Sequence, residues 1–177
     1  MRLPPALGWY RTATRIAAPF LPGVLARRAR KGKEDPARRH ERLGHPDGQR
    51  PDGVLVWMHG ASVGESLVLA SLAEALLARR PELRILVTSG TTTSAGLLAR
   101  RLPERAFHQY VPVDTPAAAR RFVEHWKPDL AVFAESELWP NLIVETARRG
   151  TPMALVNARM NARSIRSWRR RPDTARW

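Results

Sequence analysis

From residue 53 onward, short apolar runs alternate with stretches of helical periodicity, and this alternation constrains the fold more than any other feature of the chain. The apolar runs are continuous, as is typical of strands that are buried on both faces of a sheet. We expect five strands, at 53–58, 84–88, 107–111, 129–134 and 152–156. Helical patterns lie between them, at 65–80, 94–101, 116–125 and 140–149. This order predicts an α/β fold in which helices cover both faces of a parallel sheet.

Composition narrows the classes of protein that the chain can belong to. Its 177 residues suffice for one domain with a hydrophobic core. The absence of cysteine excludes a disulfide framework and a thiolate metal site. The five histidines include no pair at the spacing of metal ligands on a helix, so we expect no metal site and no cofactor.

The net charge of +14 is concentrated at the two ends of the chain. Residues 1–50 carry a net charge of +8, residues 51–158 are neutral overall, and residues 159–177 carry +6. Basic ends predict an anionic partner, which can be a nucleic acid or the anionic face of a membrane. Solvated tails without a partner are the alternative.

The first 34 residues form a basic segment with amphipathic character. Arginines and prolines interrupt its apolar residues, so no run reaches the roughly 20 residues of a membrane-spanning helix. Trp9 and Tyr10 lie close to Arg11 and Arg15, a composition that suits a segment at a lipid interface. A helix packed on the domain is the alternative. Residues 31–52, rich in Lys, Arg, Gly and Pro, are expected to form an extended linker.

Polar residues collect directly after each predicted strand. Because the carboxyl ends of parallel strands meet at one edge of a sheet, we expect these residues to converge on one crevice. The segments concerned are 60–65, 89–94, Pro112 with Asp114, 135–141, and Asn157 with Arg159.

The turn after the first strand, 59–65, contains the strongest candidate for a catalytic group. Gly60 and Gly64 let a substrate approach the backbone, and Glu65 lies at the start of a helix, where the partial positive charge favours an ionised carboxylate. Glu65 is therefore a candidate general base. Ser62-x-x-Glu65 is also a capping box, in which both side chains satisfy free N–H groups of the helix. A carboxylate folded back on its own backbone is not free to accept a substrate proton, so the two roles compete.

The remaining strand ends offer groups that can bind substrate. Thr91, Thr92 and Ser94 can hold a phosphate, a carboxylate or sugar hydroxyls, or they can form a simple capped turn. The loop lacks the Gly-Lys-Ser/Thr of a P-loop, and no G-x-G-x-x-G follows any strand, which argues against a nucleoside triphosphatase or a dinucleotide enzyme.

Two glutamates follow the fourth strand and are separated by one residue. In an extended segment Glu135 and Glu137 point the same way, and crowded carboxylates raise each other's proton affinity. Glu137 can alternatively cap the next helix. After the fifth strand, Arg159 can pair with an anionic substrate or with one of these glutamates, and Asn157 lies beside it in sequence.

Five segments occur in the same order as in 3-deoxy-D-manno-octulosonic acid (Kdo) transferases, which the chain resembles over residues 35–168. The Glu-Ser-Glu-Leu-Trp-Pro-Asn string at 135–141 is distinctive by itself. The segments are 59–65, 91–94, 110–114, 135–141 and 157–164.

The resemblance implies an inverting glycosyltransferase of the GT-B type, with two Rossmann-like domains. Such enzymes transfer Kdo from CMP-Kdo to a lipid A precursor at the cytoplasmic face of the bacterial inner membrane, with no strict need for a metal. The family's catalytic base falls on Glu65, and its second essential glutamate, which supports the transition state, falls on Glu135. The substrate-binding residues are then expected to be Ser62, Gly64, Thr91, Thr92, Ser94, Glu137, Asn157 and Arg159.

The same resemblance predicts how the chain divides. Residues 1–34 form the N-terminal segment that associates with the membrane, 35–165 the Rossmann-like acceptor-side domain, and 166–177 a basic tail. The family's C-terminal domain, which supplies most of the CMP-Kdo pocket, is expected to be absent, so that this chain is an incomplete half. A non-catalytic module that binds lipid or membrane is the alternative function, and no nucleic-acid partner is expected.

Overall fold

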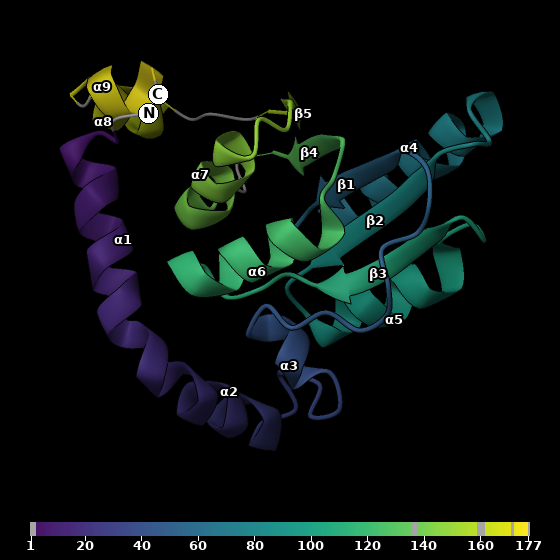
Figure 1. Ribbon diagram of the computed structural model, residues 1–177, viewed down its shortest axis with the longest axis horizontal. Helices are drawn as coiled ribbons and strands as arrows, with labels where there is room; N and C mark the ends of the chain where they lie inside the picture. Colours follow the sequence, from purple (N-terminus) through teal and green to yellow (C-terminus); the bar gives the residue numbers. More distant parts are fainter. Residues whose placement is uncertain (1–2, 136–137, 159–161, 171, 177) are drawn as a thin grey trace.

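The computed structural model describes residues 3–135, 138–158, 162–170 and 172–176, and its centre is a five-stranded parallel sheet (Figure 1). The strand order is β3-β2-β1-β4-β5, and every neighbouring pair is parallel. Each of the five predicted strands is confirmed to within two residues. Their bounds are β1 Leu55–His59, β2 Arg84–Ser89, β3 Ala106–Tyr110, β4 Leu130–Ala134 and β5 Met153–Val156.

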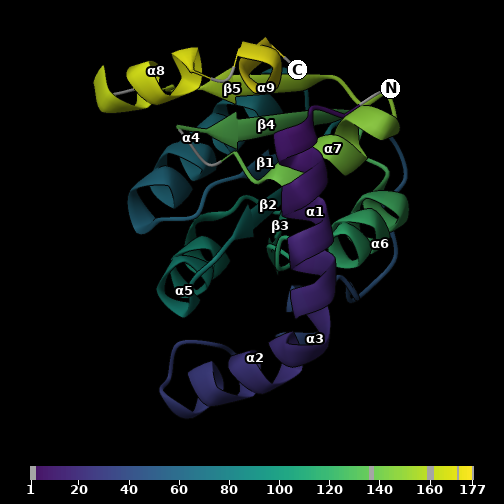
Figure 2. The ribbon, with the colours of Figure 1, turned by 90° about the vertical axis from the view of Figure 1, so that its left-hand side faces the viewer.

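Helices cover both faces of the sheet, which confirms the predicted α/β, Rossmann-like arrangement (Figure 2). One face packs against α4 (Val63–Arg79) and α5 (Thr92–Arg101). The other packs against α6 (Pro116–Trp126) and α7 (Pro140–Arg148). The two helices that connect β1 to β3 therefore share one face of the sheet, and the two that connect β3 to β5 share the other.

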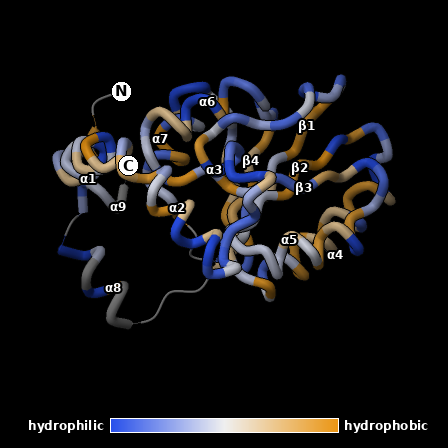
Figure 3. Tube along the Cα trace, turned by 90° about the horizontal axis from the view of Figure 1, so that it is seen from below, coloured by the Kyte–Doolittle hydropathy of each residue, from blue (hydrophilic) through white to orange (hydrophobic). Residues whose placement is uncertain are grey.

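The middle strand β1 is buried along its whole length, which explains why its sequence is apolar without alternation. Trp57 points into the core on the α6 side, where its ring lies 4.9 Å from Phe122 and 5.2 Å from Phe133. Met58 points into the opposite core beside Leu69 of α4. Burial of each such side chain contributes about 1.5–3 kcal/mol to folding. Hydrophobic residues accordingly run along the strands in Figure 3.

The N-terminal segment consists of α1 (Pro5–Ala17), the 3-10 turn η1 (Ala18–Phe20) and α2 (Leu21–Arg30), and α1 crosses α6 and α7 (Figure 2). Arg11 of α1 is buried in this contact and forms an ion pair of 2.5 Å with Glu145 of α7. Among the described residues, no helix combines the length and the hydropathy that crossing a bilayer requires. The short helices α8 (Ala162–Arg169) and α9 (Pro172–Arg176) follow β5.

The prediction of an extended linker at 31–52 is wrong. This segment contains α3 (Arg39–Arg42) and packs along the outer edge of β3. Glu41 is buried and accepts the Tyr110 N–H at 2.7 Å, while Arg38 donates to the His108 carbonyl at 2.9 Å. Charged side chains in this segment therefore replace the partner strand that β3 lacks, a role that composition alone does not reveal.

Candidate functional site

The sheet places the candidate carboxylates on either side of its switch point. After β1 the chain turns to α4 and then β2, whereas after β4 it turns to α7 and then β5, on the other side of β1. Connections that leave two neighbouring strands in opposite directions open a crevice at their carboxyl ends. Glu65 follows β1 and Glu135 follows β4, so both lie at the edge of the sheet formed by the carboxyl ends of the strands, which we call the rim.

Glu65 is buried in the first turn of α4 and is held by contacts of the capping-box kind. Its Oε1 accepts the Ser62 hydroxyl at 2.6 Å, its Oε2 accepts the Ala61 N–H at 2.7 Å, and its own N–H donates to Ser62 Oγ at 3.3 Å. Only 7% of the residue is exposed. These contacts fix the position of the carboxylate in the first turn of α4, but they also occupy the two oxygens that a general base would use.

Gly60 makes room for the Glu65 side chain. A Cβ at this position would lie 2.8 Å from the Glu65 Cβ and 3.4 Å from its Oε2. The absence of a side chain therefore lets the carboxylate pack against the end of β1. Gly64, another predicted substrate contact, is exposed in the same turn, as is Ser62.

Glu135 and Asn157 occupy equivalent, strained positions at the ends of adjacent strands. Both adopt left-handed backbone conformations, with φ of 54° and 51°. The Glu135 N–H donates to the Val156 carbonyl at 2.9 Å, and Asn157 Nδ2 donates to Glu135 Oε1 at 3.3 Å. Strain of this kind persists where surrounding structure imposes it and is concentrated at functional sites.

The threonine-rich turn before α5 has the geometry of a capped turn. Thr91 Oγ1 accepts the Ser94 N–H at 3.1 Å and donates to Ser94 Oγ at 2.8 Å. Ser94 is fully buried, Thr92 is half-buried and Thr91 is exposed. Two predicted site residues, Glu137 and Arg159, lie outside the described residues.

A buried histidine, His59, lies beneath the rim. His59 ends β1 with its Nδ1 3.0 Å from Thr88 Oγ1, and its ring stands edge-on to Trp139 at 5.5 Å. Complete burial lowers the pKa of His59 to about 4, so the ring is neutral at pH 7.

Asp114 is a contributor to the rim whose partners the sequence did not reveal. Its Oδ2 accepts the Asn141 N–H at 3.1 Å, and its Oδ1 accepts the Leu142 N–H at 3.0 Å. Asp114 thus caps α7 from a loop 27 residues away. Burial raises the pKa of this carboxyl, while the N–H donors oppose the rise. The sequence showed that a polar residue, Asp114, follows the third strand. It did not show that this residue bonds to the start of α7.

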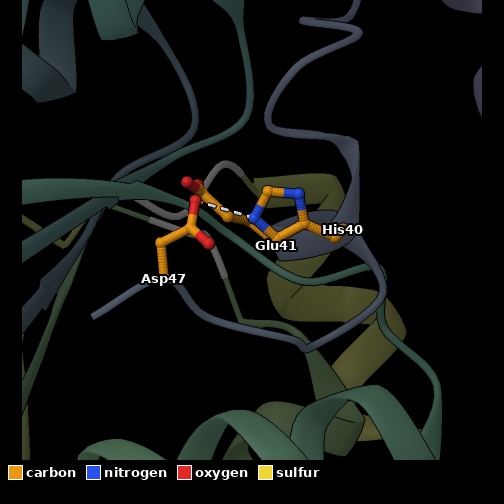
Figure 4. Close-up of side chains that lie close together, drawn as sticks. All are labelled: His40, Glu41 and Asp47. Atoms are coloured by element: carbon orange, nitrogen blue, oxygen red, sulfur yellow. Dashed lines mark ion pairs between the residues drawn. The ribbon is translucent and has the colours of Figure 1, made fainter. Parts of the chain in front are cut away.

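A cluster of possible metal ligands lies in the segment 31–52 (Figure 4). One ligand atom from each of its residues lies within 4.8 Å of the others; the residues are His40, Glu41 and Asp47. His40 Nε2 lies 2.8 Å from Asp47 Oδ2, which makes an ion pair when the ring is protonated. Glu41 already accepts bonds from Arg38 at 2.6 and 3.0 Å and from the Tyr110 N–H. A cation here would have to displace Arg38, so we assign no metal to this cluster.

Comparison with known proteins supports one family. Residues 37–177 match the family described as 3-deoxy-D-manno-octulosonic-acid transferase (kdotransferase). The chain is 44% identical over 140 residues to the 3-deoxy-D-manno-octulosonic acid transferase of Rickettsia bellii. The aligned region covers 79% of this chain and 33% of that protein. It is 36% identical over 159 residues to a probable mitochondrial 3-deoxy-D-manno-octulosonic acid transferase of Arabidopsis thaliana, covering 90% and 36%. The corresponding Haemophilus influenzae transferase is 33% identical over 142 residues, covering 80% and 33%. The chain thus spans about a third of the length of these relatives.

Proposed function

The chain belongs to the 3-deoxy-D-manno-octulosonic acid (Kdo) transferase family, and from this premise we propose that it forms the acceptor-side domain of a Kdo transferase of lipopolysaccharide biosynthesis. The donor is CMP-Kdo, the acceptor is a lipid A precursor, and the transfer inverts the anomeric centre. One observation carries the proposal: Glu65 and Glu135 follow neighbouring strands on either side of the switch point of the sheet.

In this proposal Glu65 is the general base. Its carboxylate removes the proton of an acceptor hydroxyl, the oxygen attacks the anomeric carbon of Kdo, and CMP leaves from the opposite face. Ser62 and the Ala61 N–H orient the Glu65 carboxylate before the reaction. Glu135, held by Asn157, supports the positive charge that develops on the sugar. Thr91, Thr92 and Gly64 contact substrate, whereas the buried Ser94 accepts the Thr91 hydroxyl and holds the turn.

We further propose that the protein acts at the cytoplasmic face of the inner membrane. Trp9, Ile16, Phe20 and Val24 are 50–76% exposed along α1, η1 and α2. Arg15, Arg27 and Arg30 are on the same helices, and each Lys or Arg close to an anionic surface contributes about 1 kcal/mol of attraction. This combination supports an interfacial segment that lies on the membrane.

The test is transfer of labelled Kdo to a lipid A precursor by this chain, alone and co-expressed with the remaining two thirds of a relative. We expect transfer upon complementation. Glu65→Gln should lower kcat by about 10²–10⁴-fold, as is typical for loss of a general base. Thr115→Ser, which conserves the cap of α6 away from Glu65, is the control. Full turnover by the Glu65→Gln protein would contradict the assignment.

A non-catalytic lipid-binding module is the second candidate, because Glu65 is engaged by its own helix cap. Under this alternative, co-sedimentation with anionic vesicles survives Glu65→Gln and Glu135→Gln, and no complementation produces turnover. Turnover that depends on Glu65 would reject it.

A further inference from the structure

A charged pocket of about 210 Å³ lies between α6 and α7, the two helices that α1 crosses. Besides Val123, its lining consists of Arg120, Arg148, Arg149, Glu124 and Glu145. Along α7, about 12 Å of helix separates Arg148 from Pro140, which begins the helix near the rim. We propose that this pocket binds a phosphate group and is separate from the proposed catalytic rim.

Arginine side chains in and beside the pocket share one buried carboxylate. Glu145 is only 6% exposed, and its Oε1 lies 2.5 Å from Arg11 of α1 and 3.3 Å from Arg148. Its Oε2 lies 3.7 Å from the Arg120 side chain of α6, which is beyond hydrogen-bond distance. One negative charge therefore serves three guanidinium groups, and Arg11 makes the shortest of the three contacts.

The pocket consequently has an excess of positive charge. Arg149 and Glu124 also line it, and neither forms an ion pair in the part of the chain that the structure describes. The four arginines, Arg11 included, and the two glutamates leave a net charge of +2. An anion with one or two negative charges compensates this excess, and arginine N–H groups bind such a ligand through charge-assisted hydrogen bonds.

Stabilisation of helix ends does not account for all of these arginines. Arg148 is in the last turn of α7, where a cation interacts favourably with the helix dipole. Arg120 is the fifth residue of α6, in the middle of that helix, where the effect of the dipole is lost. Both side chains nevertheless line the same pocket, so their like charges repel unless an anion lies between them.

The donors and the size of the pocket favour phosphate over other anions. The side chains of Arg120 and Arg148 are 51% and 43% exposed, so N–H groups of both remain available to a ligand. They come from two helices and approach a ligand from different directions, which suits a tetrahedral phosphate better than a planar carboxylate. A volume of about 210 Å³ is below the range of sites for drug-sized ligands, so the pocket fits one such group.

A phosphate group can reach the pocket as free phosphate or as part of a phospholipid head group. The lipid source rests on the proposed location at the membrane, because α1, which reaches Glu145 through Arg11, carries the exposed Trp9 and Ile16. Binding itself does not depend on Kdo transfer. The site can therefore be tested on this chain without the reaction.

The first probe is inorganic phosphate, titrated against this chain at constant ionic strength with sodium chloride as the balancing salt. The arginine Nε–H resonances are followed by NMR, and the dissociation constant is measured for wild type, Arg120→Gln and Arg148→Gln. Arg100→Gln is the matched control, because Arg100 is exposed in the last turn of α5, as Arg148 is in α7, but lies outside the pocket lining. Circular dichroism confirms that each variant is folded.

The second probe distinguishes the two sources of the phosphate group. It is dihexanoyl phosphatidylglycerol, used below its micellar concentration and measured on the same four proteins. Tighter binding of this lipid than of inorganic phosphate, lost in the Arg120 and Arg148 variants, supports the site with a lipid head group as its ligand. Weaker or equal binding of the lipid supports the site with free phosphate as its ligand.

We expect phosphate to shift the resonances of the three lining arginines. Each pocket variant should bind phosphate about tenfold more weakly, because one hydrogen-bonding group to a charged ligand is lost, and Arg100→Gln should bind as the wild type does. Shifts spread over exposed arginines in general, Arg100 included, would overturn the proposal, as would an affinity that neither pocket variant changes. Absence of phosphate binding would overturn it as well. Failure of Kdo transfer upon complementation would refute the proposed function alone.

Discussion

At the scale of single residues, Lys127, Glu135 and Asn157 are the non-glycine residues with left-handed backbones in the described part of the chain. Lys127 ends α6, at the opposite end of the sheet from the rim, where a left-handed residue simply terminates the helix. Glu135 and Asn157 lie at the rim and share a hydrogen bond. The same conformation therefore has a structural reason at Lys127 and, under the proposed function, a functional one at Glu135.

This difference predicts how glycine substitutions separate stability from function. Lys127→Gly and Glu135→Gly should each raise the free energy of unfolding by about 0.5–1 kcal/mol, because glycine adopts positive φ without strain. Only Glu135→Gly should abolish Kdo transfer in the complemented assay. Urea denaturation and the transfer assay measure the two effects. A Glu135→Gly protein that is less stable than the wild type would show that the strain argument is wrong.

Two histidines, the buried His59 and the half-buried His108, predict acid sensitivity. Burial lowers the pKa of His59 to about 4, and burial together with the nearby Arg38 guanidinium lowers that of His108 to about 3. The unfolded chain takes up these protons near pH 6.5, the folded chain only far below it. The free energy of unfolding should therefore fall as the pH decreases from 6.5 towards 4, by roughly 1 kcal/mol per pH unit for each histidine near pH 5.

The measurement is urea denaturation between pH 7 and 4.5 with His59→Gln beside the wild type. The variant should lose about half of the slope that the two histidines produce. Asp114, whose raised pKa acts in the opposite direction, is present in both proteins and cancels in the comparison. Equal slopes for the two proteins would exclude a neutral, buried His59 as the cause.

At the scale of elements, one helix cap only stabilises its helix, whereas another also holds the proposed catalytic base. Thr115 Oγ1 caps α6 through the Ala118 N–H at 3.3 Å. Ser62 caps α4 and also donates to Glu65. Thr115→Ala should cost about 1 kcal/mol of stability, and Ser62→Ala about 1–2 kcal/mol because a second contact is lost with the cap. Thermal unfolding of both variants checks this, and an equal loss would mean that the Ser62–Glu65 contact contributes nothing.

Helices and strands were predictable from the sequence wherever their burial against the core leaves an apolar pattern. Strands such as β1 are buried on both faces, so burial leaves a continuous apolar run. The position of Glu65 and Glu135 at one rim followed from the parallel topology. The segment 31–52 was not predictable in this way, because its contacts with β3, from Glu41 to the Tyr110 N–H and from Arg38 to the His108 carbonyl, join residues 69 and 70 positions apart. The capping of α7 by Asp114 was hidden for the same reason.

At the scale of the whole molecule, the contact between α1 and α7 depends on a buried ion pair. Arg11 donates to Glu145 at 2.5 Å and to Asn141 Oδ1 at 3.1 Å, and both charged side chains are less than 8% exposed. Arg11→Met should destabilise the protein by about 2 kcal/mol, because it leaves a buried carboxylate less compensated. The loss stays moderate since Arg148 and Arg120 lie 3.3 and 3.7 Å from Glu145.

Hydrogen exchange of the α1 amides measures this contact directly. Exchange should accelerate in Arg11→Met and return towards the wild-type rate in the double variant Arg11→Met with Glu145→Met, which removes both charges. Arg15→Met, an exposed arginine on the same helix, is the control and should leave exchange unchanged. If the α1 amides of Arg11→Met were as protected from exchange as those of the wild type, apolar contacts alone would hold α1 against α7.

The two borders of the sheet differ in whether they can accept another strand. Along β3, the His108 carbonyl and the Tyr110 N–H already have side-chain partners from Arg38 and Glu41. Along β5, Met153 and Leu155 stay 40% and 44% exposed. A strand that extended this sheet beside β3 would first have to displace Arg38 and Glu41. Arginine and glutamate side chains thus close this border of the sheet.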